Sequence, residues 1–156
     1  MARIHRVNPD LAGDDRHLWD QVCSILETFQ PDWVERGGHD QLRRFLARLV
    51  WGDHAVRLEL VVDEDRDEER VVALGLATLE AEGLSRWVFC QVGWVAPGED
   101  RTLATQYLED LKDWGRSLDA RWLVYASRRT PGALERRFKG APGGVVLHRF
   151  PIKAEA

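Results

Sequence analysis

The chain has 156 residues, of which 44% are hydrophobic and 31% are charged, and its formal net charge is -4. This composition predicts a single folded domain over residues 1–156 and excludes overall disorder. The net negative charge argues against nucleic acid as a partner, because it gives the molecule as a whole no electrostatic attraction to phosphate.

The cysteine content and the apolar runs indicate the cellular compartment of the protein. Only two cysteines are present, Cys23 and Cys90, and each lies inside an apolar segment. Such thiols suit a reducing compartment, so we expect a cytoplasmic protein without a disulfide. The first ten residues lack the apolar core of a signal peptide, and no apolar run approaches the ~20 residues of a membrane span. We therefore expect no membrane partner.

The first half of the chain predicts one strand and two helices. Residues 3–7 form a short strand, closed by Asn8-Pro9-Asp10. A helix from residue 14 or 15 ends before Pro31, with one apolar face. A second helix follows Gly37-Gly38, and its stripe is Leu42, Phe45, Leu46, Leu49 and Val50.

From residue 56 the apolar period changes from 3.6 to 2, which predicts a hairpin. Residues 56–62 form a strand with one solvated face, and residues 71–79 return as the second arm. The run DEDRDEER, residues 63–70, is all charged and predicts a solvated connection. Its carboxylates lack the glycine and spacing of a calcium loop, which argues against a metal site there.

Residues 86–118 predict a strand, a tight turn and an amphipathic helix. The strand, residues 87–95, is apolar on both faces except at Gln91, as is typical of a strand covered on two sides. Ala96-Pro97-Gly98 ends this strand. The apolar stripe of the helix is Leu103, Tyr107, Leu108, Leu111, Trp114 and Leu118.

The remainder of the chain predicts a strand, a short helix and a last strand. Residues 121–127 form a strand parallel to residues 87–95, since a helix joins the two. A short helix opens at Thr130-Pro131, and residues 145–150 form the last strand. A basic cluster of Arg128, Arg129, Arg136, Arg137 and Lys139 falls between them. It predicts either a phosphate-binding patch or a solvated helix face.

This order of elements resembles the GNAT family of N-acetyltransferases over nearly the whole chain. The family carries a Val-x-Pro followed by Arg/Gln-x-x-Gly-x-Gly/Ala at the turn after its fourth strand. Here Val95-Ala96-Pro97 matches the opening, and Arg101-x-x-Ala104-x-Gln106 is the best register for the remainder. The resemblance implies an α/β (α+β) fold, with a mixed central sheet of about six strands and about four helices.

The resemblance also implies an acetyl-CoA site at this turn. The residues that would bind acetyl-CoA as co-substrate are Gly93, Trp94, Val95, Arg101, Thr102, Leu103 and Ala104. Independently of the family, a helix N-terminus offers free amides to a pyrophosphate. Glu99 and Asp100 oppose that role by charge, and they would instead stabilise the helix dipole. Gly93 marks either a β-bulge or a packing position within the strand.

Acetyl transfer needs a proton acceptor for the amine and a proton donor for the departing thiolate. The family's glutamate and tyrosine are missing from their usual places, so we name Tyr125 and Ser127 as the catalytic candidates. The alternative for Tyr125 is a core position with a backbone partner. Cys90 is expected to be inert packing. The five histidines are scattered without ligand spacing, so we expect no metal.

Two functions remain open. The first is an acetyltransferase that acts on a small-molecule or peptide amine. The alternative is a catalytically inactive GNAT-like binding or assembly module, possible in a phage or mobile element, which the degraded glycine pattern and the acidic turn favour. A third, nucleic-acid-directed reading depends on the basic cluster and conflicts with the overall acidity. The acceptor and the oligomeric state do not follow from the sequence.

Overall fold

The computed structural model describes residues 2–29, 42–47, 55–64, 68–127 and 146–152. The elements, in chain order, are β1 (Ala2–Val7), η1 (Arg16–Leu18), α1 (Trp19–Phe29), β2 (Val56–Glu64), β3 (Glu69–Glu82), β4 (Ser85–Val95), α3 (Thr102–Ser117), β5 (Trp122–Ser127) and β6 (Val146–Pro151). Residues 42–47 are also helical. No helix among these residues is long and apolar enough to cross a membrane.

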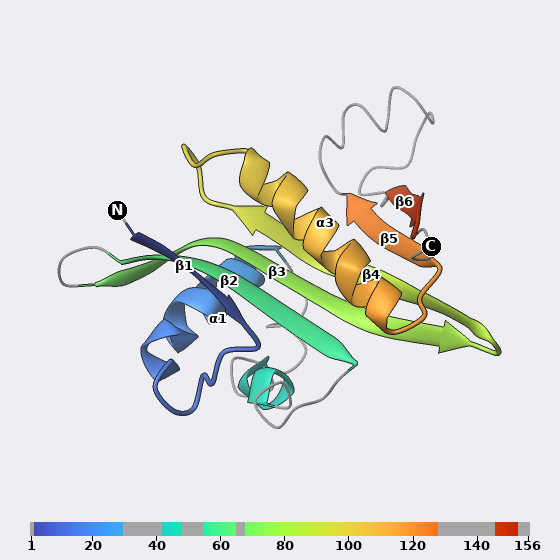
Figure 1. Ribbon diagram of the computed structural model, residues 1–156. Coiled ribbons are helices and arrows are strands. Elements are labelled where there is room, and N and C mark those ends of the chain that lie inside the picture. Colours follow the sequence, from blue (N-terminus) through green and yellow to red (C-terminus); the bar gives the residue numbers. More distant parts are fainter. Residues whose placement is uncertain (1, 30–41, 48–54, 65–67, 128–145, 153–156) are drawn as a thin grey trace, which may run out of the picture.

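The six strands form one sheet in the order in which they occur along the chain. All neighbouring pairs are antiparallel except β4 and β5, which are parallel and joined by α3. Figure 1 shows α3 crossing one face of the sheet, with α1 on the opposite face. The predicted mixed six-stranded sheet and the predicted strand-helix-strand unit are therefore confirmed.

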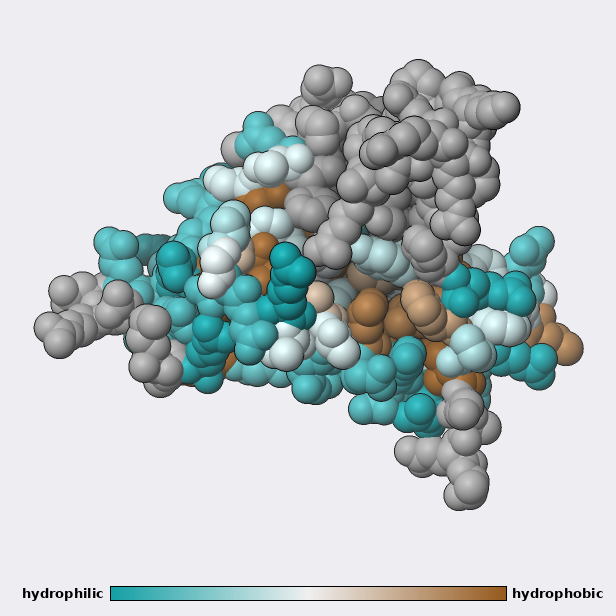
Figure 2. Space-filling model, turned by 90° about the horizontal axis from the view of Figure 1, so that it is seen from above, coloured by the Kyte–Doolittle hydropathy of each residue, from teal (hydrophilic) through white to brown (hydrophobic). Residues whose placement is uncertain are grey.

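Each face of the sheet has its own core. Alternate residues of β2, with Leu58 and Leu60 fully buried, pack with α1 and the helix at residues 42–47. The second core lies under α3, where Leu111 meets Val88 and Leu123. Cys23 belongs to the first core and Cys90 to the second, and both are buried free thiols, as expected. On the face drawn in Figure 2, hydrophilic residues cover much of the described surface and apolar ones show through between them.

The hairpin of β2 and β3 extends further than the sequence predicts. β2 continues to Glu64 and β3 begins at Glu69, so both ends of the acidic run belong to strands. Asp63 is only 2% exposed, and its carboxylate pairs with Arg3 at 3.2 Å and Arg70 at 3.9 Å. The prediction that residues 63–70 form a solvated connection is wrong at this position, because cations from β1 and β3 compensate a buried charge that a one-dimensional pattern shows as solvated.

The next hairpin is also longer than expected. β3 runs to Glu82 and β4 begins at Ser85, which leaves Gly83 and Leu84 at the turn. Gly83 has φ +59, in the left-handed region that glycine adopts without a Cβ clash. Leu84 is fully exposed at this tip. The fourth predicted helix and the basic cluster lie outside the described residues.

A paired glycine position sets the distance between α3 and the sheet. Gly75 of β3 is opposite Gly93 of β4, and the ring of Tyr107 lies over Gly75. A Cβ built on Gly75 would lie 2.1 Å from two ring carbons of Tyr107. The same addition at Gly93 would meet no atom nearer than 3.9 Å. Of these two glycines, Gly75 is therefore the one that the Tyr107 ring requires.

We predict that Gly75→Ala destabilises the protein by roughly 1–3 kcal/mol, because the added methyl group displaces Tyr107 from a packed position. Chemical denaturation monitored by circular dichroism measures this change. Gly93→Ala is the matched control and should change the free energy of unfolding by much less. In a Tyr107→Ala background the extra cost of Gly75→Ala should largely vanish. Equal costs in both backgrounds would contradict the assigned contact.

Candidate functional site

The site begins where β4 loses one of its two neighbours. β4 pairs with β3 along its whole length, from Ser85 to Val95. Its parallel pairing with β5 runs only from Trp87 to Cys90, which lies opposite Tyr125. Beyond that point β5 continues to Ser127 paired with β6, and β4 continues to Val95 without a β5 partner. The far end of β4 therefore has a backbone edge that β5 does not pair.

A β-bulge at Gln91 lies at the point where the pairing stops. Leu76 is opposite Val92 while Ala77 is opposite Cys90, so Gln91 has no partner in β3. One extra residue reverses the alternation of side chains. Cys90 consequently packs in the core under α3, and Val92 packs in the core on the α1 side. The interpretation of Gly93 as the bulge is wrong by two residues, because Gly93 is regularly paired with Gly75.

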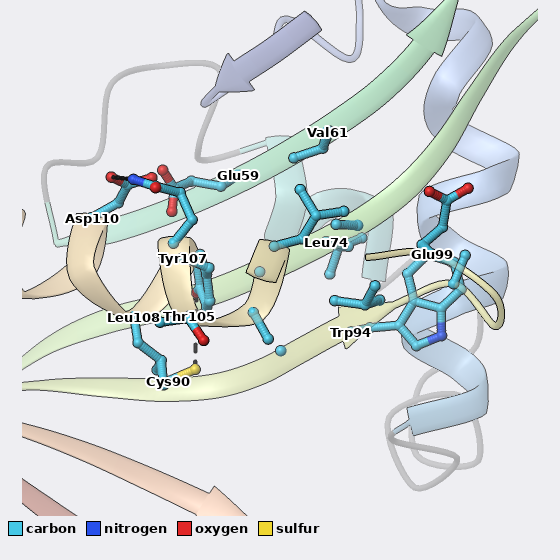
Figure 3. Close-up of a pocket in the computed structure, with 18 of the residues that line it drawn as sticks. Glu59, Val61, Leu74, Cys90, Trp94, Glu99, Thr105, Tyr107, Leu108 and Asp110 are labelled. Carbon is cyan, nitrogen blue, oxygen red and sulfur yellow. Dashed lines mark hydrogen bonds between the residues drawn. The ribbon is translucent and has the colours of Figure 1, made fainter. Parts of the chain in front are cut away.

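Tyr107 and Cys90 meet under the first half of α3. The sulfur of Cys90 lies 3.9 Å from the Tyr107 hydroxyl oxygen and 3.7 Å from the backbone oxygen of Val92 (Figure 3). Burial raises the pKa of the Cys90 thiol to about 12, and burial also raises the pKa of Tyr107 well above its usual value. Both groups are therefore protonated at neutral pH. This agrees with the expectation that Cys90 is inert packing.

The turn between β4 and α3 uses its two acidic residues as structural partners. Glu99, 13% exposed, accepts hydrogen bonds from Arg3 at 2.5 Å and from Arg70 at 3.2 Å. Asp100 accepts a hydrogen bond from the Thr102 amide at 2.9 Å, and this bond lowers the pKa of its carboxyl group. Two cations thus neutralise Glu99, while Asp100 occupies one amide at the start of the helix. Arg101 is exposed.

The remaining amides of this turn are partly used as well. The Leu103 amide donates to the Asp100 carbonyl, and the Ala104 amide donates to the Arg101 carbonyl, both at 3.2 Å. These bonds span three residues and tighten the first turn. Gly98, with φ +83, lets the chain reverse before the helix begins. The helix start therefore offers fewer free donors than a simple N-terminus does.

A cavity of about 1700 Å³ connects the unpaired end of β4, this turn and the first half of α3. Seven residues named from the sequence line it: Gly93, Trp94, Val95, Arg101, Leu103, Ala104 and Tyr125. Thr102 does not line it. Ser127 ends β5, but its side chain lies outside the described residues.

The sequence does not point to the polar lining on the other side of α3. Arg57 and Glu59 project from β2, and His5 from β1, into the same cavity as Tyr107. Glu59 is only 3% exposed, and its Oε1 accepts a hydrogen bond from Arg57 at 2.8 Å. Alternation along β2 predicts which face Arg57 and Glu59 occupy, but it predicts that this face is solvated. Glu59 is buried because Asp110 of α3 meets it on this face, together with His5 and Arg57.

The fold is similar to those of solved acetyltransferase structures. A chain of the NatC complex bound to a Gag peptide and CoA matches 98% of this chain and 100% of its own, with a TM-score of 0.66 and 11% identity. A structure from Desulfovibrio desulfuricans, described as a GNAT-family acetyltransferase, matches 97% of this chain and 100% of its own, with a TM-score of 0.65 and 14% identity. Arabidopsis thaliana NAA60 with a bisubstrate analogue matches 99% and 100%, with a TM-score of 0.59 and 14% identity.

No protein-family model and no curated protein sequence matches the chain. At 11% and 14% identity, full-length agreement with these structures establishes the fold alone. The chain therefore has the GNAT acetyltransferase fold, as its order of elements predicts.

Proposed function

We propose that the protein is an acetyltransferase that transfers the acetyl group of acetyl-CoA to an amine of a small molecule or a peptide. The observation that carries the proposal is the shared cavity of the unpaired β4 end and the α3 N-terminus. A backbone edge and a helix start in one cavity suit a long ligand that has an amide-containing arm and a phosphate end. The similar folds with CoA or a bisubstrate analogue support the same function.

The residues at the two ends of this ligand have distinct roles. The backbone of Gly93, Trp94 and Val95 would hydrogen-bond the amides of the arm along the edge of β4 that β5 does not pair. Arg101 provides a cation for the phosphates, and the α3 N-terminus adds its partial positive charge around Thr102, Leu103 and Ala104. Glu99 does not oppose this binding, because Arg3 and Arg70 already neutralise it.

When bound, acetyl-CoA supplies an activated acyl carbon and a thiolate leaving group. The residues of this chain must therefore hold the acceptor amine and return a proton to sulfur. Tyr125 is half-buried in the cavity lining, and it lies opposite Cys90 at the point where β4 and β5 separate. We therefore assign to the Tyr125 hydroxyl the role of donating this proton to the sulfur. Ser127 follows two residues later on β5, and we keep it as a second donor.

The capped helix start favours the alternative, a binding module without chemistry. Asp100 occupies the Thr102 amide, and the next two amides donate to backbone carbonyls. These bonds reduce what the turn can offer a pyrophosphate. Measurement of acetyl-CoA binding, followed by measurement of CoA release with an amine, decides between the two functions.

We predict micromolar binding of acetyl-CoA, about -8 kcal/mol, in calorimetric titration after removal of any carried-over ligand. Arg101→Glu should weaken binding by more than tenfold, because it replaces the phosphate-facing cation with an anion. The melting temperature should change little, since Arg101 is exposed. Arg16→Glu is the control, with the same charge change on η1, and should bind as the native protein does. Equal affinity of the Arg101 and Arg16 variants would remove the turn from the site.

The role of Tyr125 predicts a selective loss of rate. Tyr125→Phe should lower kcat for CoA release with an accepted amine by roughly 10²-fold or more, because a general acid is lost, with unchanged acetyl-CoA affinity. A thiol-reactive dye measures the released CoA. Tyr107→Phe is the matched control and should retain most of its kcat. A Tyr125→Phe variant that turns over at the native rate would contradict this assignment.

A further inference from the structure

Three potential ligand groups converge beside α3, from three elements that are far apart in the sequence. His5 of β1, Glu59 of β2 and Asp110 of α3 each offer one ligand atom, and these atoms lie within 4.8 Å of one another. The β1–β2 register places Val7 opposite Glu59, so His5 is the diagonal neighbour of Glu59 on the same face. All three residues line the cavity. Figure 3 shows Glu59 and Asp110 next to one another, beside Tyr107.

The buried carboxylate of this cluster has one unused oxygen. Glu59 is 3% exposed, and its Oε1 accepts the Arg57 hydrogen bond at 2.8 Å. Its Oε2 is buried and has no hydrogen-bond partner among the described residues. An unpartnered buried polar oxygen is costly and calls for a water, a ligand or an ion, and the imidazole and second carboxylate beside Oε2 favour an ion here.

Each carboxylate of the cluster is held in place by a neighbouring donor. Arg57 donates to Oε1 of Glu59, and the Gln106 amide donates to Oδ1 of Asp110 at 3.1 Å. Metal-binding carboxylates in proteins are oriented by such hydrogen bonds from outer residues. Coordination through Oε2 of Glu59 would leave the Arg57 bond intact.

We propose that His5, Glu59 and Asp110 form a binding site for a divalent transition-metal ion, with Zn²⁺ as the best match. The ligand atoms of the three residues lie within 4.8 Å of one another, and Oε2 of Glu59 is the carboxylate oxygen that Arg57 leaves available to an ion. The imidazole and the two carboxylates are also the donors that zinc accepts in three-residue sites.

Arg57 limits the affinity of this site, because its positive charge lies against Glu59. Its guanidinium is also 5.8 Å from the centre of the Trp114 ring, which holds it near the cluster. We therefore expect a dissociation constant on the order of micromolar rather than the tighter binding of a structural zinc site. The ion would join β1, β2 and α3, independently of whether the protein transfers acetyl groups.

The test is titration of the chelator-treated, dialysed full chain with ZnCl₂ by calorimetry, together with Co²⁺ absorption as a report of coordination. We expect one site per chain and the intense visible bands of four-coordinate Co²⁺. Glu59→Gln and His5→Gln should each weaken Zn²⁺ binding by more than roughly tenfold. Because His5 is 46% exposed, its variant folds even if the Glu59 variant does not.

Asp63→Asn is the matched control. It removes another buried β2 carboxylate, 2% exposed, which pairs with Arg3 and Arg70 and does not belong to the three-residue cluster. It should leave Zn²⁺ affinity within about twofold of native. Absent binding in the native chain, or equal affinity in all three variants, would overturn the proposal. If a simple primary amine such as butylammonium binds at the cluster and Zn²⁺ does not, the proposal is overturned in favour of an ammonium site.

Discussion

The interruption of pairing along β4 is the constraint on which the rest of the structure depends. A strand in the middle of a sheet normally pairs on both sides, and its backbone is then closed to other partners. Here pairing with β5 stops at Cys90, and the bulge at Gln91 follows at once. The residues beyond it keep only β3 as a neighbour. Because α3 starts immediately after β4, the unpaired edge and the helix N-terminus necessarily share one end of the sheet.

The position of α3 follows from side-chain volume at the same strands. Gly75 lets the Tyr107 ring lie against β3, so the helix crosses the sheet at close range. α3 thereby divides the face of the sheet that it covers into two regions. On one side lies the apolar core with Val88 and Leu123, and on the other lies a polar region with Glu59 and Arg57. One buried aromatic residue therefore helps to define both the proposed cofactor cleft and the proposed metal site.

The fold was largely predictable because strong local patterns coincide with its elements. Period-2 alternation located β2, and the apolar stripe located α3 within one residue at each end. The bulge was not predicted at Gln91, because a single polar side chain in an apolar strand does not by itself distinguish an unpaired residue from a paired one. The burial of Asp63 was missed for a related reason. Its compensating cations, Arg3 and Arg70, come from two other strands.

The candidate site was predictable only in part. The turn after Val95-Ala96-Pro97 identified the cavity lining on the β4 side, including Arg101. The meeting of His5, Glu59 and Asp110 follows from the β1–β2 register and the placement of α3, which linear spacing does not encode. The expectation of no metal rested on that spacing alone. It stays a prediction, and the proposed zinc site is its direct competitor.

The most direct measurement is a two-dimensional NMR titration of the ¹⁵N-labelled protein with CoA. If the unpaired end of β4 and the α3 start bind the cofactor, the largest amide shifts will fall on Gly93, Trp94, Val95 and residues 101–104. Amides of α1 on the opposite face will change little. Shifts confined to other parts of the chain, or no shifts at millimolar CoA, would contradict the account.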